Sequence, residues 1–202
     1  MLEAPYYKKL DNLISKDYSD FLYEYLWVMA RHTTFETGEL NLELNQEGNP
    51  MNIFELYSDL TFDVVLHKLH KRVEKETGLN LIPTYSFARL YGNKAVLYPH
   101  IDRPSCEYSI SLKLGDNGKG SWPLVMEGTE VHMDAGDGVL YEGMRVKHWR
   151  DVCPFEGYKS GHLFLHYVDA DGSFSHYEYD GNDYKKQLFS TTLEEIVGQW
   201  NL

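Results

Sequence analysis

The stretch Tyr98-Pro99-His100-Ile101-Asp102-Arg103 places an imidazole and a carboxylate two residues apart. It follows and overlaps a mostly apolar run, Ala95–Ile101, that is expected to form a β-strand. Because side chains alternate between the two faces of a strand, His100 and Asp102 should point to the same side. One further histidine would complete a two-His-one-carboxylate site, which suits Fe(II) and leaves coordination positions open for other ligands.

A second His-x-Asp pair, His132-Met133-Asp134, also occurs. The position of the third ligand along the chain decides which of the two pairs is the better candidate for the metal site. In a jelly-roll the strands that carry the ligands are neighbours, and the chain between them forms much of the two sheets. Four strands of about 5–6 residues with their turns need roughly 30–45 residues. Residues 103–147 supply that length before His148, whereas the chain between Asp134 and His148 is too short. Asp134 also opens a turn sequence that explains it without a metal. We therefore expect His100, Asp102 and His148 to be the ligands.

Short strand-like runs separated by Gly, Asn, Asp and Pro extend on both sides of this stretch. About eight of them follow residue 80, and eight strands are typical of a jelly-roll. The sequence thus predicts a mostly β fold with flanking helices and a double-stranded β-helix (jelly-roll) core. The expected strands are Leu81–Tyr91, Ala95–Ile101, Glu107–Leu114, Trp122–Met126, Thr129–Met133, Gly138–Tyr141, Val146–Trp149 and Gly161–Val168.

Helical periodicity precedes these strands. Apolar residues at three- and four-residue steps predict one helix from about Ser15 or Asp17 to Met29, and another over Phe62–Val73 that ends near Gly78. Residues 33–50 are polar and predict a loop or a short hairpin. A capping box at Thr191 or Thr192 predicts a last helix that runs to Trp200. We expect a single domain over 1–202, with mainly helical support over 1–79, the jelly-roll core over 80–170 and a C-terminal extension over 171–202.

Composition excludes some partners. The 202 residues carry 19 Lys and Arg against 31 Asp and Glu, a formal net charge of −12, which disfavours nucleic acid and membranes. Two cysteines, Cys106 and Cys153, are too few for a disulfide framework, and the N-terminus has no apolar secretion signal. A cytoplasmic location is therefore expected, and the oligomeric state is left open.

The order and spacing of several motifs over residues 80–170 resemble the Fe(II)- and 2-oxoglutarate-dependent oxygenases of the prolyl 4-hydroxylase type. The motifs are Arg89-Leu90-Tyr91-Gly92, the His-x-Asp stretch, Ala135-Gly136-Asp137-Gly138-Val139-Leu140-Tyr141, His148, Pro154 and Gly157-Tyr158-Lys159. The resemblance implies iron on His100, Asp102 and His148, with 2-oxoglutarate and dioxygen as cosubstrates and ascorbate as a further candidate cofactor. It implies hydroxylation of a C–H bond, first of a prolyl residue in a peptide, with a free amino acid or small metabolite as the alternative substrate.

The resemblance also implies a basic residue about ten positions after His148, which pairs with the far carboxylate of 2-oxoglutarate. Lys159 fills that position best, and Arg150 and His162 are its rivals. Tyr91 matches a family position whose phenol contacts the same cosubstrate, although a core role is the alternative.

The family often carries another tyrosine on the strand after the His-x-Asp motif. This chain has Leu112 there, with Tyr108 and Ser111 nearby. Arg103 and Glu107 are expected at the mouth of the site, either as substrate contacts or as a salt bridge with each other.

Two other classes of function remain open. A non-catalytic cupin-like module would hold a metal or another ligand without turnover, and it would form no succinate from 2-oxoglutarate. An all-β interaction domain with incidental histidines is the second alternative.

Overall fold

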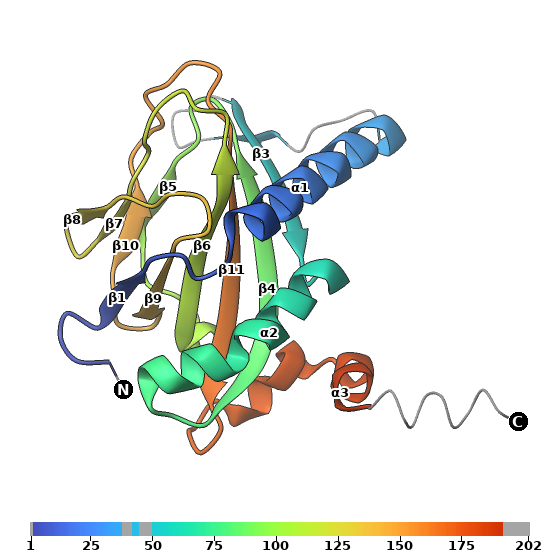
Figure 1. The fold of residues 1–202 in the computed structure, drawn as a ribbon, viewed down its shortest axis with the longest axis vertical. Helices are drawn as coiled ribbons and strands as arrows, with labels where there is room; N and C mark the ends of the chain where they lie inside the picture. The colour runs from blue at the N-terminus through green and yellow to red at the C-terminus, as the bar shows by residue number, and fades with distance from the viewer. Residues whose placement is uncertain (1, 38–41, 45–49, 192–202) are drawn as a thin grey trace, which may run out of the picture.

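Two antiparallel sheets face each other in the computed structural model, which describes residues 2–37, 42–44 and 50–191 (Figure 1). The larger sheet has the strand order β1-β9-β6-β11-β4-β3-β2, and the smaller has the order β5-β10-β7-β8. The strands are β1 (Tyr7–Leu10), β2 (Leu42–Leu44), β3 (Pro50–Tyr57), β4 (Leu81–Tyr91), β5 (Leu97–His100), β6 (Tyr108–Asp116), β7 (Leu124–Met126), β8 (Thr129–Val131), β9 (Gly138–Glu142), β10 (His148–Arg150) and β11 (Ser160–Asp169). The predicted jelly-roll core and each of its eight expected strands are confirmed.

Two helices, α1 (Lys16–Thr37) and α2 (Leu60–Thr77), cover the outer face of the larger sheet (Figure 1). Alternate residues of the central strands point to these helices, which gives the main core its aliphatic character. The helix α2 is capped at its start by Asp59, whose carboxylate accepts a hydrogen bond from the Thr61 N–H at 2.9 Å, and at its end by the left-handed Gly78. Within the described part of the chain, no helix is long and apolar enough to cross a membrane.

The larger sheet contains strands that the sequence pattern did not predict. β1 pairs with β9, and β3 pairs with β4 in the register Ile53↔Tyr91. Ile53 and Phe54 are adjacent and both buried, so β3 lacks the alternation that marks a half-exposed strand. β2 and β3 form the short hairpin that was one of the two expectations for residues 33–50, while α1 extends to Thr37.

The C-terminal extension packs against the sheet and α2 through η2 (Ser175–Gly181) and α3 (Asp183–Ser190). Lys185 on α3 forms a buried ion pair with Asp63 on α2, and Asp63 also accepts a hydrogen bond from the Ser86 hydroxyl at 2.6 Å. The helix expected to run from Thr191 or Thr192 to Trp200 falls on residues 192–202, outside the described residues. The C-terminal extension thus contacts the core through the ion pair between Lys185 and Asp63, which are far apart in the sequence.

Candidate metal centre

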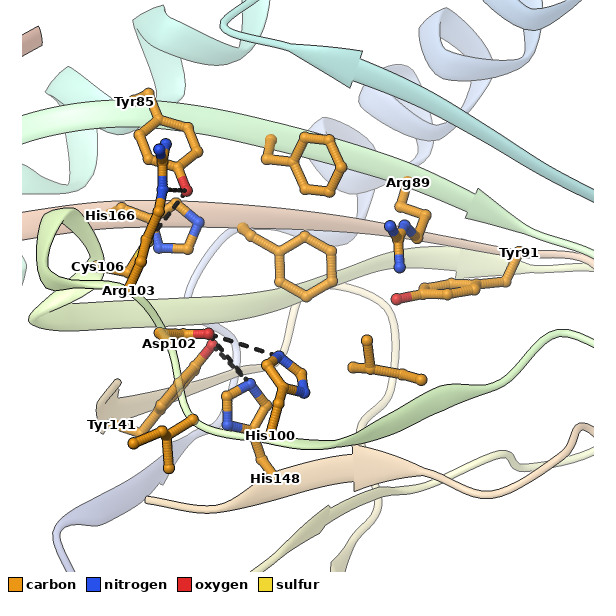
Figure 2. Close-up of a pocket in the computed structure, with 14 residues that line it drawn as sticks. Tyr85, Arg89, Tyr91, His100, Asp102, Arg103, Cys106, Tyr141, His148 and His166 are labelled. Atoms are coloured by element: carbon orange, nitrogen blue, oxygen red, sulfur yellow. Dashed lines mark hydrogen bonds and ion pairs between the residues drawn. The ribbon is translucent and has the colours of Figure 1, made fainter. Parts of the chain in front are cut away.

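The three expected ligands come together between the two sheets (Figure 2). His148 on β10 stands directly opposite His100 on β5 in the strand register. Asp102 lies just beyond β5, where its backbone N–H donates to the Gly143 carbonyl at 2.8 Å. One ligand atom from each of His100, Asp102 and His148 lies within 4.8 Å of the others. We call these three residues the triad.

Both imidazoles of the triad are oriented by backbone carbonyls. His100 Nδ1 lies 2.7 Å from the Tyr98 oxygen, and His148 Nδ1 lies 3.0 Å from the Val146 oxygen. Because a carbonyl only accepts, each Nδ1 carries the proton and each Nε2 keeps its lone pair. Both Nε2 atoms lie 3.6 Å from the same oxygen, Oδ1 of Asp102. Burial lowers the pKa of His148, which keeps the ring in the neutral form that binds metals.

The second oxygen of Asp102 faces away from the two histidines. The Ser109 hydroxyl lies 3.2 Å from Oδ2, and His166 Nδ1 lies 2.8 Å from the same hydroxyl. These contacts fix the carboxylate so that Oδ1 is left for a metal. The sequence reading missed Ser109 and His166, although alternation along β6 and β11 places both on the face between the sheets.

The triad opens into a cavity of about 230 Å³. Phe87 and Phe164 supply apolar walls. Arg89 and Tyr91 lie at one end (Figure 2). The opposite end is polar and contains Tyr85, Arg103, Cys106 and His166. The triad therefore stands at the side of a cavity that extends in two directions.

Lys159 does not reach this cavity, so the expected pairing of Lys159 with the cosubstrate is not supported. The residues of β11 that point between the sheets are His162, Phe164 and His166, whereas Leu163 points to the helices. Lys159 has the same phase as Leu163 and lines a separate cavity beside Trp27 of α1. Lys159 misses the triad's cavity because successive side chains along β11 point to opposite faces of the sheet, and the phase of Lys159 places it on the face that the helices cover.

Arg150 is a cation that is buried between the sheets. It is 1% exposed, donates to the Trp122 carbonyl at 2.7 Å, and lies 3.2 Å from His162 Nδ1. Among the described residues, no carboxylate forms an ion pair with Arg150. Its Nε and the hydroxyl of the fully buried Tyr91 have no hydrogen-bond partner there. A buried cation without a counter-ion, near unpartnered donors, points to an anionic ligand.

The departure at Leu112 has a simple structural meaning. Leu112 points into the core beneath the helices, while its neighbour Ser111 points between the sheets. The Ser111 hydroxyl is buried and has no hydrogen-bond partner among the described residues. Ser111 is thus the β6 residue that faces the interior of the jelly-roll.

Arg103 and Glu107 separate in the structure. Arg103 lines the cavity and donates to Asp180 of the C-terminal extension at 3.1 Å. Glu107 instead accepts a hydrogen bond from the Asp169 backbone N–H at 2.9 Å and does not line the cavity. The expected salt bridge between Arg103 and Glu107 is absent from the described ion pairs, and Glu107 is not placed to contact a substrate there.

The rival pair lies on the surface. His132 is exposed, and its Nδ1 lies 2.8 Å from the Ser121 hydroxyl. The Asp134 backbone N–H donates to Asp137 within the turn. His132 and Asp134 do not join the triad.

Comparisons with known proteins establish the fold. No protein-family model matches the sequence, and no curated protein matches it significantly. The non-heme alpha-ketoglutarate-dependent epimerase SnoN from nogalamycin biosynthesis matches with a TM-score of 0.61 and 14% identity, over 82% of this chain and 79% of that one. A prolyl-4-hydroxylase of Pseudomonas putida matches with a TM-score of 0.57 and 16% identity, over 81% and 92%. The viral collagen prolyl hydroxylase of Paramecium Bursaria Chlorella virus-1, solved with 2-oxoglutarate, matches with a TM-score of 0.56 and 12% identity, over 80% and 95%.

Proposed function

We propose that this chain is an Fe(II)- and 2-oxoglutarate-dependent oxygenase whose iron is held by His100, Asp102 and His148. The observation that carries the proposal is the convergence of three ligand atoms, one from each residue, within 4.8 Å of one another. The Nε2 atoms of both histidines lie 3.6 Å from Asp102 Oδ1. Two imidazoles and one carboxylate suit Fe(II) and leave positions for a chelating cosubstrate and dioxygen. The bound iron and cosubstrate supply the oxidation of a C–H bond, while the protein binds and orients the reactants.

We further propose that Arg150 and Tyr91, in place of Lys159, hold the far carboxylate of 2-oxoglutarate. Arg150 does not itself line the triad's cavity, but it offers a buried positive charge over the Trp122 ring, which packs edge-on against Tyr91. Tyr91 lines the cavity, and its hydroxyl has no hydrogen-bond partner among the described residues. Arg89, the neighbouring cation of that cavity, already forms an ion pair with Glu55. An anion at Arg150 would supply the counter-charge that the protein itself leaves out.

The polar end of the cavity is the proposed substrate side. The cavity is small for a cosubstrate together with an extended peptide, and Arg103 at its wall is joined to Asp180 of the C-terminal extension. These features favour hydroxylation of a free amino acid or small metabolite. A prolyl residue in a peptide is the competing substrate, and matched free and peptidyl substrates distinguish the two.

Metal binding and succinate formation test the proposal together. Asp102→Ala should abolish Mn²⁺ binding measured by calorimetry and the Fe(II)-dependent conversion of 2-oxoglutarate to succinate. Asp134→Ala is the matched control, because it removes the aspartate of the other His-x-Asp pair from an exposed turn, and it should retain both. Full succinate formation by Asp102→Ala would exclude the triad as the iron site. Mn²⁺ binding by the wild type without succinate formation under any condition would favour the cupin-like module.

A further inference from the structure

A second group of metal-binding side chains lies at the polar end of the cavity. Asp102, Cys106 and His166 each offer one ligand atom, and these atoms also lie within 4.8 Å of one another. Cys106 belongs to the short helix η1 (Pro104–Cys106), and His166 belongs to β11. Both are buried and both line the triad's cavity. We propose that these residues form a second metal site, for a thiophilic divalent cation such as Zn²⁺.

The donor set sets this site apart from the triad. Thiolate sulfur selects soft or borderline ions such as Zn²⁺, and Cys, His and Asp are the usual protein ligands of Zn²⁺. The triad contains only nitrogen and oxygen donors, which bind Fe(II) and Mn²⁺ and do not select for a thiophilic ion. Two clusters with different donor softness therefore stand on either side of Asp102.

The surroundings of Cys106 favour a bound thiolate. The Tyr85 hydroxyl lies 3.0 Å from the Cys106 sulfur and can donate to it. The guanidinium of Arg103 lies 4.8 Å from the centre of the Tyr85 ring, so a positive charge stands close behind this phenol.

His166 has the outer contact that metal-binding histidines usually have. The Ser109 hydroxyl lies 2.8 Å from Nδ1 and fixes the orientation of the ring. The His166 ring therefore already has a fixed orientation toward the cavity.

The two clusters share Asp102, which links their occupancy. Oδ1 of Asp102 faces the triad histidines, and Oδ2 faces the Ser109 side. A cation on Cys106 and His166 draws this carboxylate away from the triad, so Zn²⁺ at the second site weakens iron binding at the first. This competition rests on the proposed function, whereas the second site itself does not.

Cobalt reports the second site directly, because Co²⁺ bound to a thiolate shows a strong sulfur-to-metal charge-transfer absorption in the near ultraviolet. The wild type should develop this band on titration with Co²⁺. Cys106→Ser should lose it, with Cys106→Ala as a second replacement. Cys153→Ser removes the other buried cysteine and should keep the band. His148→Ala removes a triad ligand and should also keep it.

X-ray absorption of the wild type saturated with Zn²⁺, so that the triad and the second site are both supplied with metal, needs no variant and should show a sulfur neighbour at about 2.3 Å. A shell of nitrogen and oxygen alone would overturn the second site, as would a cobalt band that disappears in Cys153→Ser or in His148→Ala. In the activity assay, the Zn²⁺ concentration that halves succinate formation should rise by about tenfold or more in Cys106→Ser. If no succinate forms at all but the Zn–S distance is found, the proposed function fails and the second site stands.

Discussion

Gly143 lies so close to Asp102 that a β-carbon at position 143 would meet Asp102 Oδ2 at 2.6 Å and the Cys106 carbonyl oxygen at 2.1 Å. The same glycine accepts the hydrogen bond from the Asp102 backbone N–H at 2.8 Å. The missing side chain of Gly143 therefore makes the room in which the triad carboxylate stands.

Gly143→Ala should weaken metal binding while the sheets remain folded. The added methyl group has to displace both the Cys106 backbone carbonyl and the Asp102 carboxylate, and disturbing the support of a metal ligand typically costs about 10–100-fold in affinity. Calorimetric titration with Mn²⁺ measures the change. Gly78→Ala is the control, because Gly78 ends α2 in a left-handed conformation with nothing within 4 Å of an added β-carbon. Gly78→Ala should lower the free energy of unfolding and leave the Mn²⁺ affinity unchanged. A Mn²⁺ affinity of Gly143→Ala equal to that of the wild type would contradict the prediction.

Arg150→Gln should weaken 2-oxoglutarate binding to the Mn²⁺-loaded protein. Removing one member of a buried charge pair costs about 2–5 kcal/mol, which is roughly 30- to several-thousand-fold in affinity. Mn²⁺ binding itself should change little, because Arg150 is not a triad ligand. Lys159→Ala, on the other side of the sheet, should titrate 2-oxoglutarate like the wild type.

A cosubstrate analogue isolates the charge from general disturbance of the fold. 2-Oxopentanoate keeps the chelating end of 2-oxoglutarate and has a methyl group where the far carboxylate stands. The wild type should bind it much more weakly than 2-oxoglutarate, and Arg150→Gln should bind the two with similar affinity. Undiminished discrimination in Arg150→Gln would assign the carboxylate to another cation, with Arg89 the first to examine.

His162 should make the protein sensitive to acid. Burial, and then the charges of Arg150 and Lys113, hold the pKa of His162 well below its usual value of about 6.5. The unfolded chain therefore takes up a proton below about pH 6.5 that the folded chain refuses, and stability falls as the pH falls, by up to about 1.4 kcal/mol per pH unit for one group. Urea unfolding between pH 7 and 5 should show a smaller loss in His162→Gln than in the wild type. His176→Gln, at an exposed position, should follow the wild type.

The Lys185–Asp63 pair should behave as a buried ion pair does. Lys185→Met leaves the Asp63 carboxylate buried without its cation and should lower the free energy of unfolding by about 3–5 kcal/mol. The double variant Asp63→Asn with Lys185→Met removes both charges and should recover much of that loss, as measured by urea unfolding. A double variant that is less stable than Lys185→Met would contradict this reading.

The jelly-roll core was predictable because its strands alternate and end at turn residues. The His-x-Asp spacing brought His100 and Asp102 to the same site, although Asp102 lies just beyond the end of β5 and is held there by its hydrogen bond to Gly143. The distance along the chain identified His148. The alternation of side chains along a strand would also have placed Arg150, two residues after His148, on the same face as His148. It would also have put Lys159 out of phase with His162 and Phe164, so the cosubstrate cation was within reach of the sequence.

Other parts depend on contacts between segments far apart in the chain. The strand β3 carries adjacent buried residues, Ile53 and Phe54, and therefore shows no strand period. The need for glycine at position 143 comes from its approach to Asp102 and Cys106, which no local pattern records. The contact between Asp180 and Arg103 likewise depends on where the C-terminal extension packs.

The place of β11 has a consequence for how the chain is made. It lies between β6 and β4 near the middle of the larger sheet, yet it is the last of the described strands in sequence (Figure 1). During synthesis the ribosome releases β4, β6 and β9 before the strand that joins β4 to β6 exists. Until β11 has been synthesised, β4 and β6 lack their shared partner strand, so unpaired strand edges and apolar faces stay exposed. Such intermediates are prone to aggregation. The larger sheet can therefore close only after β11 has been synthesised, and we expect the yield of folded protein to depend on how well the earlier strands are protected until then.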